Sequence, residues 1–175
     1  MPVAAEVARA LDAPLDVAVV CKIGAPHNRE LAVGALGEGG VHVVSGHTAR
    51  ALGISDAGMH ALIAGGERQL AEGLRRYRGG RPAAALTGRT VILVDDGLAT
   101  GRSARAAVCS LRRRGAARVV LAVPVAAPES VDALRPHVEE IVCVEMPAEM
   151  WAVGLWYEDF RPPADEELAA LLVTA

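Results

Sequence analysis

The stretch VILVDDGLATGRS, residues 91–103, runs from four apolar residues into two adjacent acids and then into a loop of small and hydroxyl residues. From Thr90 onward, the sequence alternates between strand-like and helix-like segments. Strands are predicted at residues 90–94, 118–123 and 140–144, and helices at residues 103–114 and 130–134. This alternation predicts an α/β fold built on a parallel sheet.

Two acids, Asp95 and Asp96, end the first of these strands. In open parallel sheets, ligands bind beyond the carboxyl ends of the strands. The small residues at 97–101 let backbone N–H groups close around an anion, and the helix that follows adds the positive end of its dipole. Thr100 and Ser103 supply hydroxyl donors, whereas the Gly-Lys-Ser/Thr ending of a P-loop is absent. The stretch therefore predicts a phosphate-binding loop beside two acids that suit ribose hydroxyls and a magnesium ion.

The first half of the chain gives weaker signals. The expected elements are a helix at residues 3–11, strands at 15–21 and 41–45, and a helix that Ser55 caps and that runs to about residue 77. Residues 15–21 form a continuous apolar run, which is typical of a strand buried on both faces. Glycines and polar residues dominate residues 24–40, where no strand is expected and where a mobile lid is predicted.

Composition restricts the class of protein. A chain of 175 residues favours a single domain, and 52% apolar with only 3% aromatic residues predicts a core of Ala, Val and Leu. The net charge of −3 argues against a dedicated nucleic-acid binder. No apolar run approaches the roughly 20 residues of a membrane span. The three cysteines are scattered and odd in number, so reduced thiols and a cytoplasmic location are expected.

The same thirteen residues carry a family resemblance. Residues 91–103 resemble the phosphoribosyl-pyrophosphate (PRPP) motif of type I phosphoribosyltransferases at all thirteen positions, with Gly97 and Arg102 slightly unusual. That motif is four apolar residues, two acids, two mostly apolar residues, a variable position, Thr-Gly, a small residue and Thr or Ser. The flanking stretches LDVAVVCKIGAPHNRELAVGA and WAVGLWYEDF are similar to a bacterial group of stand-alone phosphoribosyltransferase-like proteins.

The resemblance implies a single doubly wound domain over residues 1–175, with residues 24–88 as a flap and helical excursion and residues 145–175 as a hood-like segment. It also implies transfer of 5-phosphoribosyl from PRPP to an acceptor, with a nucleobase as the favoured acceptor, and Mg²⁺ as cofactor. Asp95 and Asp96 would bind the ribose 2- and 3-hydroxyls and the metal, and would act in catalysis. The substrate-binding residues it implies are Lys22, Gly97, Leu98, Ala99, Thr100, Gly101, Arg102, Ser103 and Trp151, of which those from Ala99 to Ser103 would hold the 5-phosphate.

Three departures from the family pattern bear on function. Ala99 stands where hypoxanthine/guanine enzymes have Asp, so adenine- or uracil-type loops fit better. Cys21 stands before Lys22 where relatives usually have Arg-Lys, and Lys22 could contact pyrophosphate or be a solvated strand-end charge. The strand and Arg-Gly-Gly loop that precede the first helix in the family are not seen. The expectation is a truncated or mis-started chain, with one core strand missing between residues 15–21 and 90–94.

Several residues allow more than one interpretation. Trp151 and Trp156 could stack on a base or simply fill the core. Scattered histidines, including His42, match no usual metal-ligand spacing. The arginines at 112–114 more readily favour a helix C-terminus than a nucleic-acid site. Two classes of function remain: a phosphoribosyltransferase, and a regulator that binds PRPP or a nucleotide without catalysis. A homodimer is compatible with either.

Overall fold

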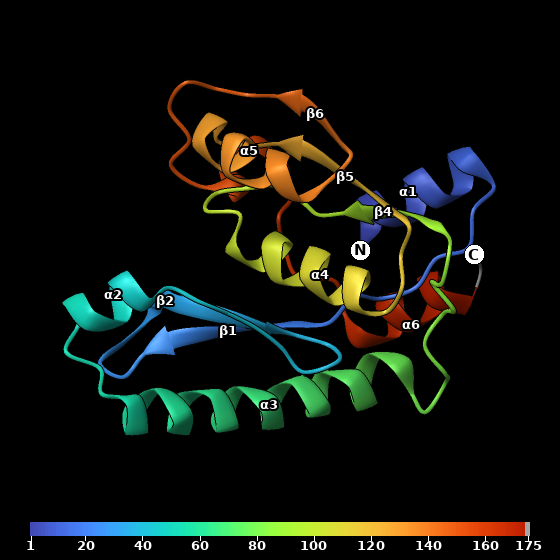
Figure 1. Cartoon of the computed structure of the whole chain (residues 1–175). Helices are drawn as coiled ribbons and strands as arrows, with labels where there is room; N and C mark the ends of the chain where they lie inside the picture. The colour runs from blue at the N-terminus through green and yellow to red at the C-terminus, as the bar shows by residue number, and fades with distance from the viewer. Residues whose placement is uncertain (174–175) are drawn as a thin grey trace.

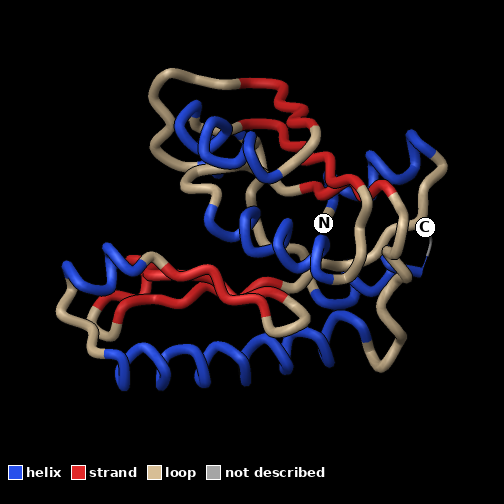
Figure 2. The backbone as a smooth tube through the Cα atoms, viewed as in Figure 1, coloured by secondary structure: helices blue, strands red, loops and turns tan. Residues whose placement is uncertain are grey.

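The computed structural model describes residues 1–173, which form two three-stranded sheets with helices packed around them (Figures 1 and 2). The elements are α1 (Pro2–Leu11), β1 (Val20–Ala25), β2 (Asn28–Gly37), β3 (Val41–Val44), α2 (Gly46–Ala51), α3 (Asp56–Arg78), β4 (Thr90–Val94), α4 (Arg102–Arg113), β5 (Arg118–Val125), α5 (Pro128–Leu134), η1 (Arg135–His137), β6 (Glu140–Glu145), η2 (Val153–Trp156) and α6 (Asp165–Val173).

The second half of the chain forms the parallel sheet that the sequence predicts. Its strand order is β4-β5-β6, and both ladders are parallel, with Thr90 opposite Arg118 and Val120 opposite Glu140. Leu98, Leu121 and other aliphatic side chains fill the space between this sheet, α4 and α5. The prediction of an α/β fold with a parallel sheet is confirmed, and the core consists of Ala, Val, Leu and Ile, close to expectation.

The strands of this sheet are buried on one face only. In β5, every second residue from Val119 to Val125 is at most 3% exposed, and these side chains face the helices. On the opposite face, Ile92 is 37% exposed and Val144 76%. The apolar run of β4 would suit a strand buried on both faces, but within the described residues helices cover only one face of this sheet.

The first half of the chain forms a separate antiparallel sheet of order β1-β2-β3. Two predictions fail here: residues 24–40 contain the long strand β2, and the strand expected at residues 15–21 begins only at Val20. The glycines that suggested a loop are points of close approach. A Cβ on Gly34 would lie 2.7 Å from the Val43 carbonyl oxygen, and one on Gly37 would lie 2.8 Å from the Ala106 carbonyl oxygen. Glycine thus allows neighbouring backbone to pack against β2.

Residues 15–19 make hydrogen bonds to side chains in place of a strand ladder. The Val19 N–H donates to the buried Glu38 carboxylate at 3.2 Å, and the Val17 carbonyl accepts from the Arg78 guanidinium at 2.8 Å. The strands β1 and β4 belong to different sheets. Within residues 1–173, β1 is an edge strand of the antiparallel sheet and β4 is an edge strand of the parallel sheet. The core strand that the family resemblance places between them stays a prediction.

The long helix α3 covers one face of the antiparallel sheet, and α4 covers the other (Figure 1). Ser55 caps α3 as predicted, with its hydroxyl accepting from the Gly58 N–H at 3.2 Å. Small residues on α4 allow it to pack between the two sheets, since Ala104, Ala106 and Ala107 are each at most 4% exposed. The division into a core and a 24–88 excursion stays a prediction.

The first helix does not bury the whole of its apolar stripe. Val3, Val7, Ala10 and Leu11 recur at helical spacing, yet Leu11 is 57% exposed. Ala5 and Ala8 are the buried residues of α1. The helix ends at Asp12 in a left-handed conformation, which turns the chain immediately after Leu11. Within the described residues, no helix is long and apolar enough to span a bilayer.

Candidate functional site

The acidic loop lies at the carboxyl end of β4, as predicted. The Asp95 N–H still donates to Ala122 of β5 at 3.2 Å, and the chain then leaves the sheet. Leu98 anchors the loop: its side chain is 1% exposed, its N–H donates to Val125 and its carbonyl accepts from the Ala127 N–H. Leu98 therefore holds the loop in place, and the geometry does not favour direct binding of substrate by its side chain.

The loop ends in the N-terminus of α4. Gly101 is the N-cap residue with φ of 65°, a left-handed conformation that glycine adopts readily. The first N–H groups of a helix have no partners within the helix, so those at Arg102 and Ser103 can bind an anion. The Ala99 carbonyl accepts from Ser130 at 2.7 Å, which fixes the opposite side of the loop. The loop thus leads into a helix N-terminus, as expected, and phosphate binding there stays a prediction.

Arg102 has a role that the motif does not reveal. Its guanidinium donates to the Ala32 carbonyl of β2 at 2.9 Å. This contact joins the start of α4 to the antiparallel sheet, so the Arg102 guanidinium already has a partner within the fold. The hydrogen bond to Ala32 therefore favours a structural role for the Arg102 side chain over substrate binding.

The two acids repel one another. The Asp96 N–H donates to Asp95 Oδ1 at 3.0 Å, and burial together with the charge of Asp96 raises the pKa of Asp95 to about 6. Two carboxylates in a partly buried position destabilise the fold unless a cation or hydroxyl donors bind to them. This cost is a reason to regard the pair as a binding site.

The raised pKa of Asp95 gives a prediction about stability. The folded state binds the Asp95 proton more tightly than the unfolded state, so the stabilising contribution is complete below the ordinary pKa of 3.8 and is lost as the pH rises through about 6. We expect the free energy of unfolding to fall over this range by at most about 3 kcal/mol from this group. Asp95→Asn should abolish that fall and stabilise the unliganded protein at neutral pH.

Denaturant titration at several pH values checks this expectation. Asp132→Asn, which changes an exposed carboxylate on α5, should follow the wild-type curve. If the Asp95→Asn and wild-type curves run parallel between pH 4 and 7, Asp95 does not have the raised pKa.

The C-terminal segment contacts this loop, and sequence reasoning missed the contact. The Tyr157 hydroxyl donates to the Asp96 carbonyl at 2.6 Å. A Cβ on Gly97 would lie 2.7 Å from Val153 Cγ1, so η2 packs directly on the loop. Burial, and then the charges of Asp96 and Asp95, raise the pKa of Tyr157. The sequence did contain a signal for this contact, because the stretch WAVGLWYEDF carries most of the chain's aromatic residues. The stacking prediction, however, concerned only the two tryptophans of this stretch.

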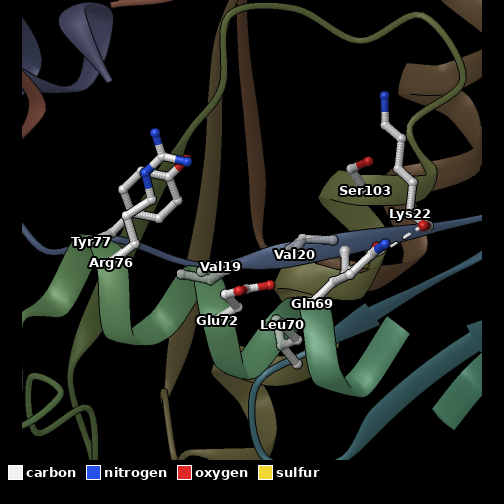
Figure 3. Close-up of a pocket in the computed structure, with 11 residues that line it drawn as sticks. Val19, Val20, Lys22, Gln69, Leu70, Glu72, Arg76, Tyr77 and Ser103 are labelled. Atoms are coloured by element: carbon white, nitrogen blue, oxygen red, sulfur yellow. Dashed lines mark hydrogen bonds between the residues drawn. The ribbon is translucent and has the colours of Figure 1, made fainter. Parts of the chain in front are cut away.

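A cavity of about 530 Å³ separates β1, α3 and the start of α4. Lys22 and Ser103 line it from opposite elements and point to the same side (Figure 3). Arg76 and Tyr77 of α3 line its other end. The structure therefore brings together two residues that the sequence predicts for substrate binding and that are 81 positions apart.

Trp151 does not fill the core. It is 85% exposed, and Trp156 is 46% exposed, so the interpretation of core burial is wrong for Trp151. Stacking of Trp151 on a base stays a prediction. Met146, Leu155 and Phe160 are also about half exposed or more, which gives this segment an apolar surface.

His42, Arg112 and Arg113 have partners within the fold. His42 Nε2 lies 3.2 Å from the Glu67 carboxylate. Within residues 1–173 no cluster of three or more His, Cys, Asp or Glu side chains forms a metal site. Arg112 binds Glu139, and Arg113 donates to the Gly40 carbonyl at 3.0 Å. The three cysteines are free and partly buried.

Asp95 and Asp96 can supply part of the coordination shell of a Mg²⁺ ion. Mg²⁺ is commonly held by one or two carboxylates together with substrate phosphate oxygens and waters. Asp95 and Asp96 supply two adjacent carboxylates whose mutual repulsion a cation would relieve. The residues present therefore suit a metal that arrives with a phosphorylated substrate.

The fold and the site together define a class: an α/β protein in which an acidic loop at the carboxyl end of a parallel strand leads into a helix N-terminus. The chain belongs to the phosphoribosyl transferase domain family, whose model matches residues 1–159. The family resemblance inferred from residues 91–103 is thereby confirmed.

The relatives agree with this assignment. Two curated Mycobacterium tuberculosis proteins, each named "Putative phosphoribosyl transferase", are 43% identical over 172 residues, which is 98% of this chain and 39% of theirs. The chain thus spans about two fifths of their length. A 47-residue segment is 53% identical to a uracil phosphoribosyltransferase of Lactobacillus gasseri, covering 27% of this chain and 22% of that protein. The crystal structure of TT1426 from Thermus thermophilus has a TM-score of 0.78 and 43% identity, covering 97% of this chain and 80% of that one.

Proposed function

We propose that this chain is a PRPP-dependent phosphoribosyltransferase, which transfers the 5-phosphoribosyl group to a small acceptor and releases pyrophosphate. The observation that carries the proposal is the pairing of Asp95 and Asp96 with a loop that ends in a helix N-terminus. Burial, and then the charge of Asp96, penalise the charged form of Asp95, and Leu98 and Ser130 hold the loop in place. A ligand that carries both hydroxyl groups and a phosphate could bind to the acids through its hydroxyls and to the loop through its phosphate.

Each part of the site has a role in this reaction. The acids accept hydrogen bonds from the ribose 2- and 3-hydroxyls. They also stabilise the positive charge that develops at C1 when the bond to pyrophosphate breaks. The N–H groups and hydroxyls of residues 99–103 hold the 5-phosphate and fix the ribose. Lys22, which shares a cavity with Ser103, offers a positive charge to the leaving pyrophosphate.

Mg²⁺ is the proposed cofactor, held by Asp95 and Asp96 together with oxygens of PRPP. When bound, it supplies neutralisation of the pyrophosphate charge. The carboxylates orient the ribose in this arrangement, and the loop excludes water from the 5-phosphate.

The proposed acceptor is a nucleobase. Ala99 provides no carboxylate near the acceptor, so a hypoxanthine-type base mechanism is disfavoured. The exposed ring of Trp151 is available for stacking on a planar base. The segment shared with a uracil phosphoribosyltransferase supports a base-type acceptor.

The second candidate function is a regulator that binds PRPP or a nucleotide without turnover. It is favoured by Ala99, which provides no carboxylate near the acceptor. Pyrophosphate release from PRPP, measured with a panel of purine and pyrimidine bases, separates the two. Release that depends on one base, and that is lost in Asp96→Asn, supports the enzyme. Tight PRPP binding without release under any base supports the regulator.

We propose a cytoplasmic location, supported by three thiols that are free in the structure. A homodimer is proposed on the exposed apolar side chains of residues 144–160, which suit an interface.

A further inference from the structure

The peptide unit between Asp96 and Gly97 lies between two fixed points of the chain. Before it, the Asp95 N–H donates to Ala122, and after it the Leu98 N–H donates to Val125. Both partners belong to β5. The Asp96 carbonyl lies in the chain between these two hydrogen bonds, beyond the paired part of β4.

The hydroxyl of Tyr157 holds that carbonyl. It donates to the Asp96 oxygen at 2.6 Å, across 61 positions of sequence. The Tyr157 ring is itself fixed, since it packs against Phe160 with ring centroids 5.1 Å apart. Phe160 in turn packs on Gly154, where a Cβ would lie 2.9 Å from Phe160 Cδ1. The hydroxyl therefore comes from a supported position in the fold.

The other side of the same peptide unit is also covered. Val153 packs on Gly97 so closely that a Cβ there would overlap with Val153 Cγ1 at 2.7 Å and would approach the Val125 carbonyl at 3.0 Å. One hydrogen bond and one van der Waals contact from the C-terminal segment thus restrict rotation of this peptide unit. Rotation about the bonds of Asp96 would swing its carboxylate relative to Asp95.

We propose that Tyr157 is a positioning residue that holds the Asp96 carboxylate in the orientation that binds the ribose hydroxyls of PRPP. The inference rests on the proposed function. Tyr157 acts through Asp96 and does not touch the reacting atoms. An error of about 1 Å in a catalytic group can lower the rate about a hundredfold, although one hydrogen bond contributes only about 1 kcal/mol to stability.

Tyr157→Phe tests the inference, because it removes the hydroxyl and keeps the ring. We expect kcat/KM for PRPP to fall roughly tenfold, with KM for the acceptor within a factor of about two and little change in melting temperature. Phe160→Leu is the matched variant that loosens the ring and keeps the hydroxyl, and it should lower kcat/KM for PRPP less. Equal effects of Tyr157→Phe on both substrates, or none on either, would overturn the proposal.

Hydrogen exchange provides a readout that needs no activity. In Tyr157→Phe, exchange should quicken at the amides of residues 96–98 and stay unchanged in β2. Unchanged exchange at residues 96–98 would contradict the positioning contact. If the wild-type protein neither binds nor turns over PRPP, the proposed function fails, and with it the part of the proposal that concerns PRPP. The exchange result still decides whether the Tyr157 contact orders the loop.

Discussion

Asp96→Asn is expected to weaken binding of the magnesium complex of PRPP by about 10- to 100-fold and to reduce phosphoribosyl transfer at least as much. The change removes one of two carboxylate charges at the metal and ribose site while it keeps the shape of the side chain. A hydrogen bond to a charged group is worth about 1.5–3 kcal/mol, which corresponds to this change in affinity. The Tyr157 contact should persist, because it is made to the Asp96 backbone carbonyl.

Isothermal titration calorimetry with PRPP and Mg²⁺ measures this effect. Asp132→Asn is the control, because Asp132 lies on the surface of α5 with a side chain 78% exposed. It should bind PRPP like the wild type. Equal affinities for Asp96→Asn and Asp132→Asn would show that the acids do not bind the ligand.

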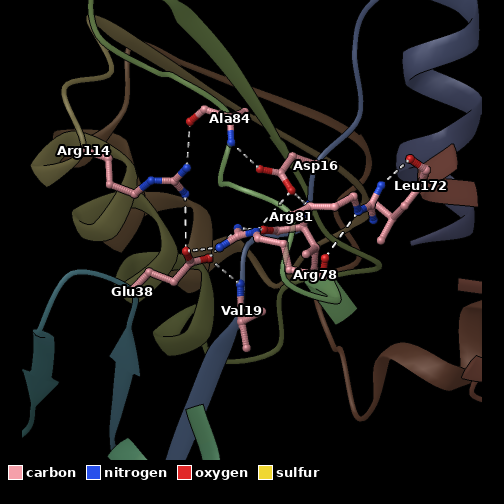
Figure 4. A network of polar contacts seen from close by, with 9 residues as sticks. Asp16, Val19, Glu38, Arg78, Arg81, Ala84, Arg114 and Leu172 are labelled. Atoms are coloured by element: carbon pink, nitrogen blue, oxygen red, sulfur yellow. Dashed lines mark hydrogen bonds and ion pairs between the residues drawn. The ribbon is translucent and has the colours of Figure 1, made fainter. Parts of the chain in front are cut away.

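Glu38→Ala is expected to cost about 3–5 kcal/mol of unfolding free energy, which is a large part of the roughly 5–15 kcal/mol of a typical domain. The Glu38 carboxylate is buried and accepts from both terminal nitrogens of Arg78, at 2.7 and 3.1 Å, while Arg114 lies 3.6 Å away (Figure 4). The hydrogen bond to Glu38 raises the pKa of Arg78. Removal of the Glu38 carboxylate leaves the Arg78 guanidinium, which is 10% exposed, with only Asp16 as a charged partner among the described residues.

The position of Glu38 explains the size of this effect. It joins the end of β2 to α3 through Arg78 and to α4 through Ser110, whose hydroxyl donates to the Glu38 carbonyl at 2.8 Å. Urea denaturation measures the loss of stability. Glu6→Gln, which breaks an exposed pair with Arg9, should change stability by less than about 1 kcal/mol. A Glu38→Ala protein as stable as Glu6→Gln would show that the contacts of Glu38 do not hold β2, α3 and α4 together.

The parallel half of the fold could be predicted because its signals are local. Each strand and helix after Thr90 has its own periodicity, and the order of elements alone indicates a parallel sheet. The antiparallel half could not be predicted in the same way. Gly34 and Gly37 were interpreted as loop residues, since their reason for being glycine lies in the carbonyls of Val43 and Ala106, which are distant in sequence. Residues 15–19 were apolar enough for a strand, but the charges of Glu38 and Arg78 take up their backbone groups.

The candidate site divides similarly. Asp95, Asp96 and the loop after them form one contiguous motif, so the sequence contains them in full. Tyr157 could not be found from the motif, because its contact depends on how the C-terminal segment folds back onto the loop after β4. The role of Arg102 was hidden for the same reason, since its partner is a backbone carbonyl of β2.

The measurement that tests the central claim most directly is a calorimetric titration of the wild-type chain with PRPP in the presence and absence of Mg²⁺. We predict one site per chain with a dissociation constant in the micromolar range, about −8 kcal/mol, and much weaker binding without the metal. Ribose 5-phosphate, which lacks pyrophosphate, should bind more weakly than PRPP. Absence of binding at millimolar PRPP with Mg²⁺ would contradict the assignment of Asp95, Asp96 and their loop as a PRPP site.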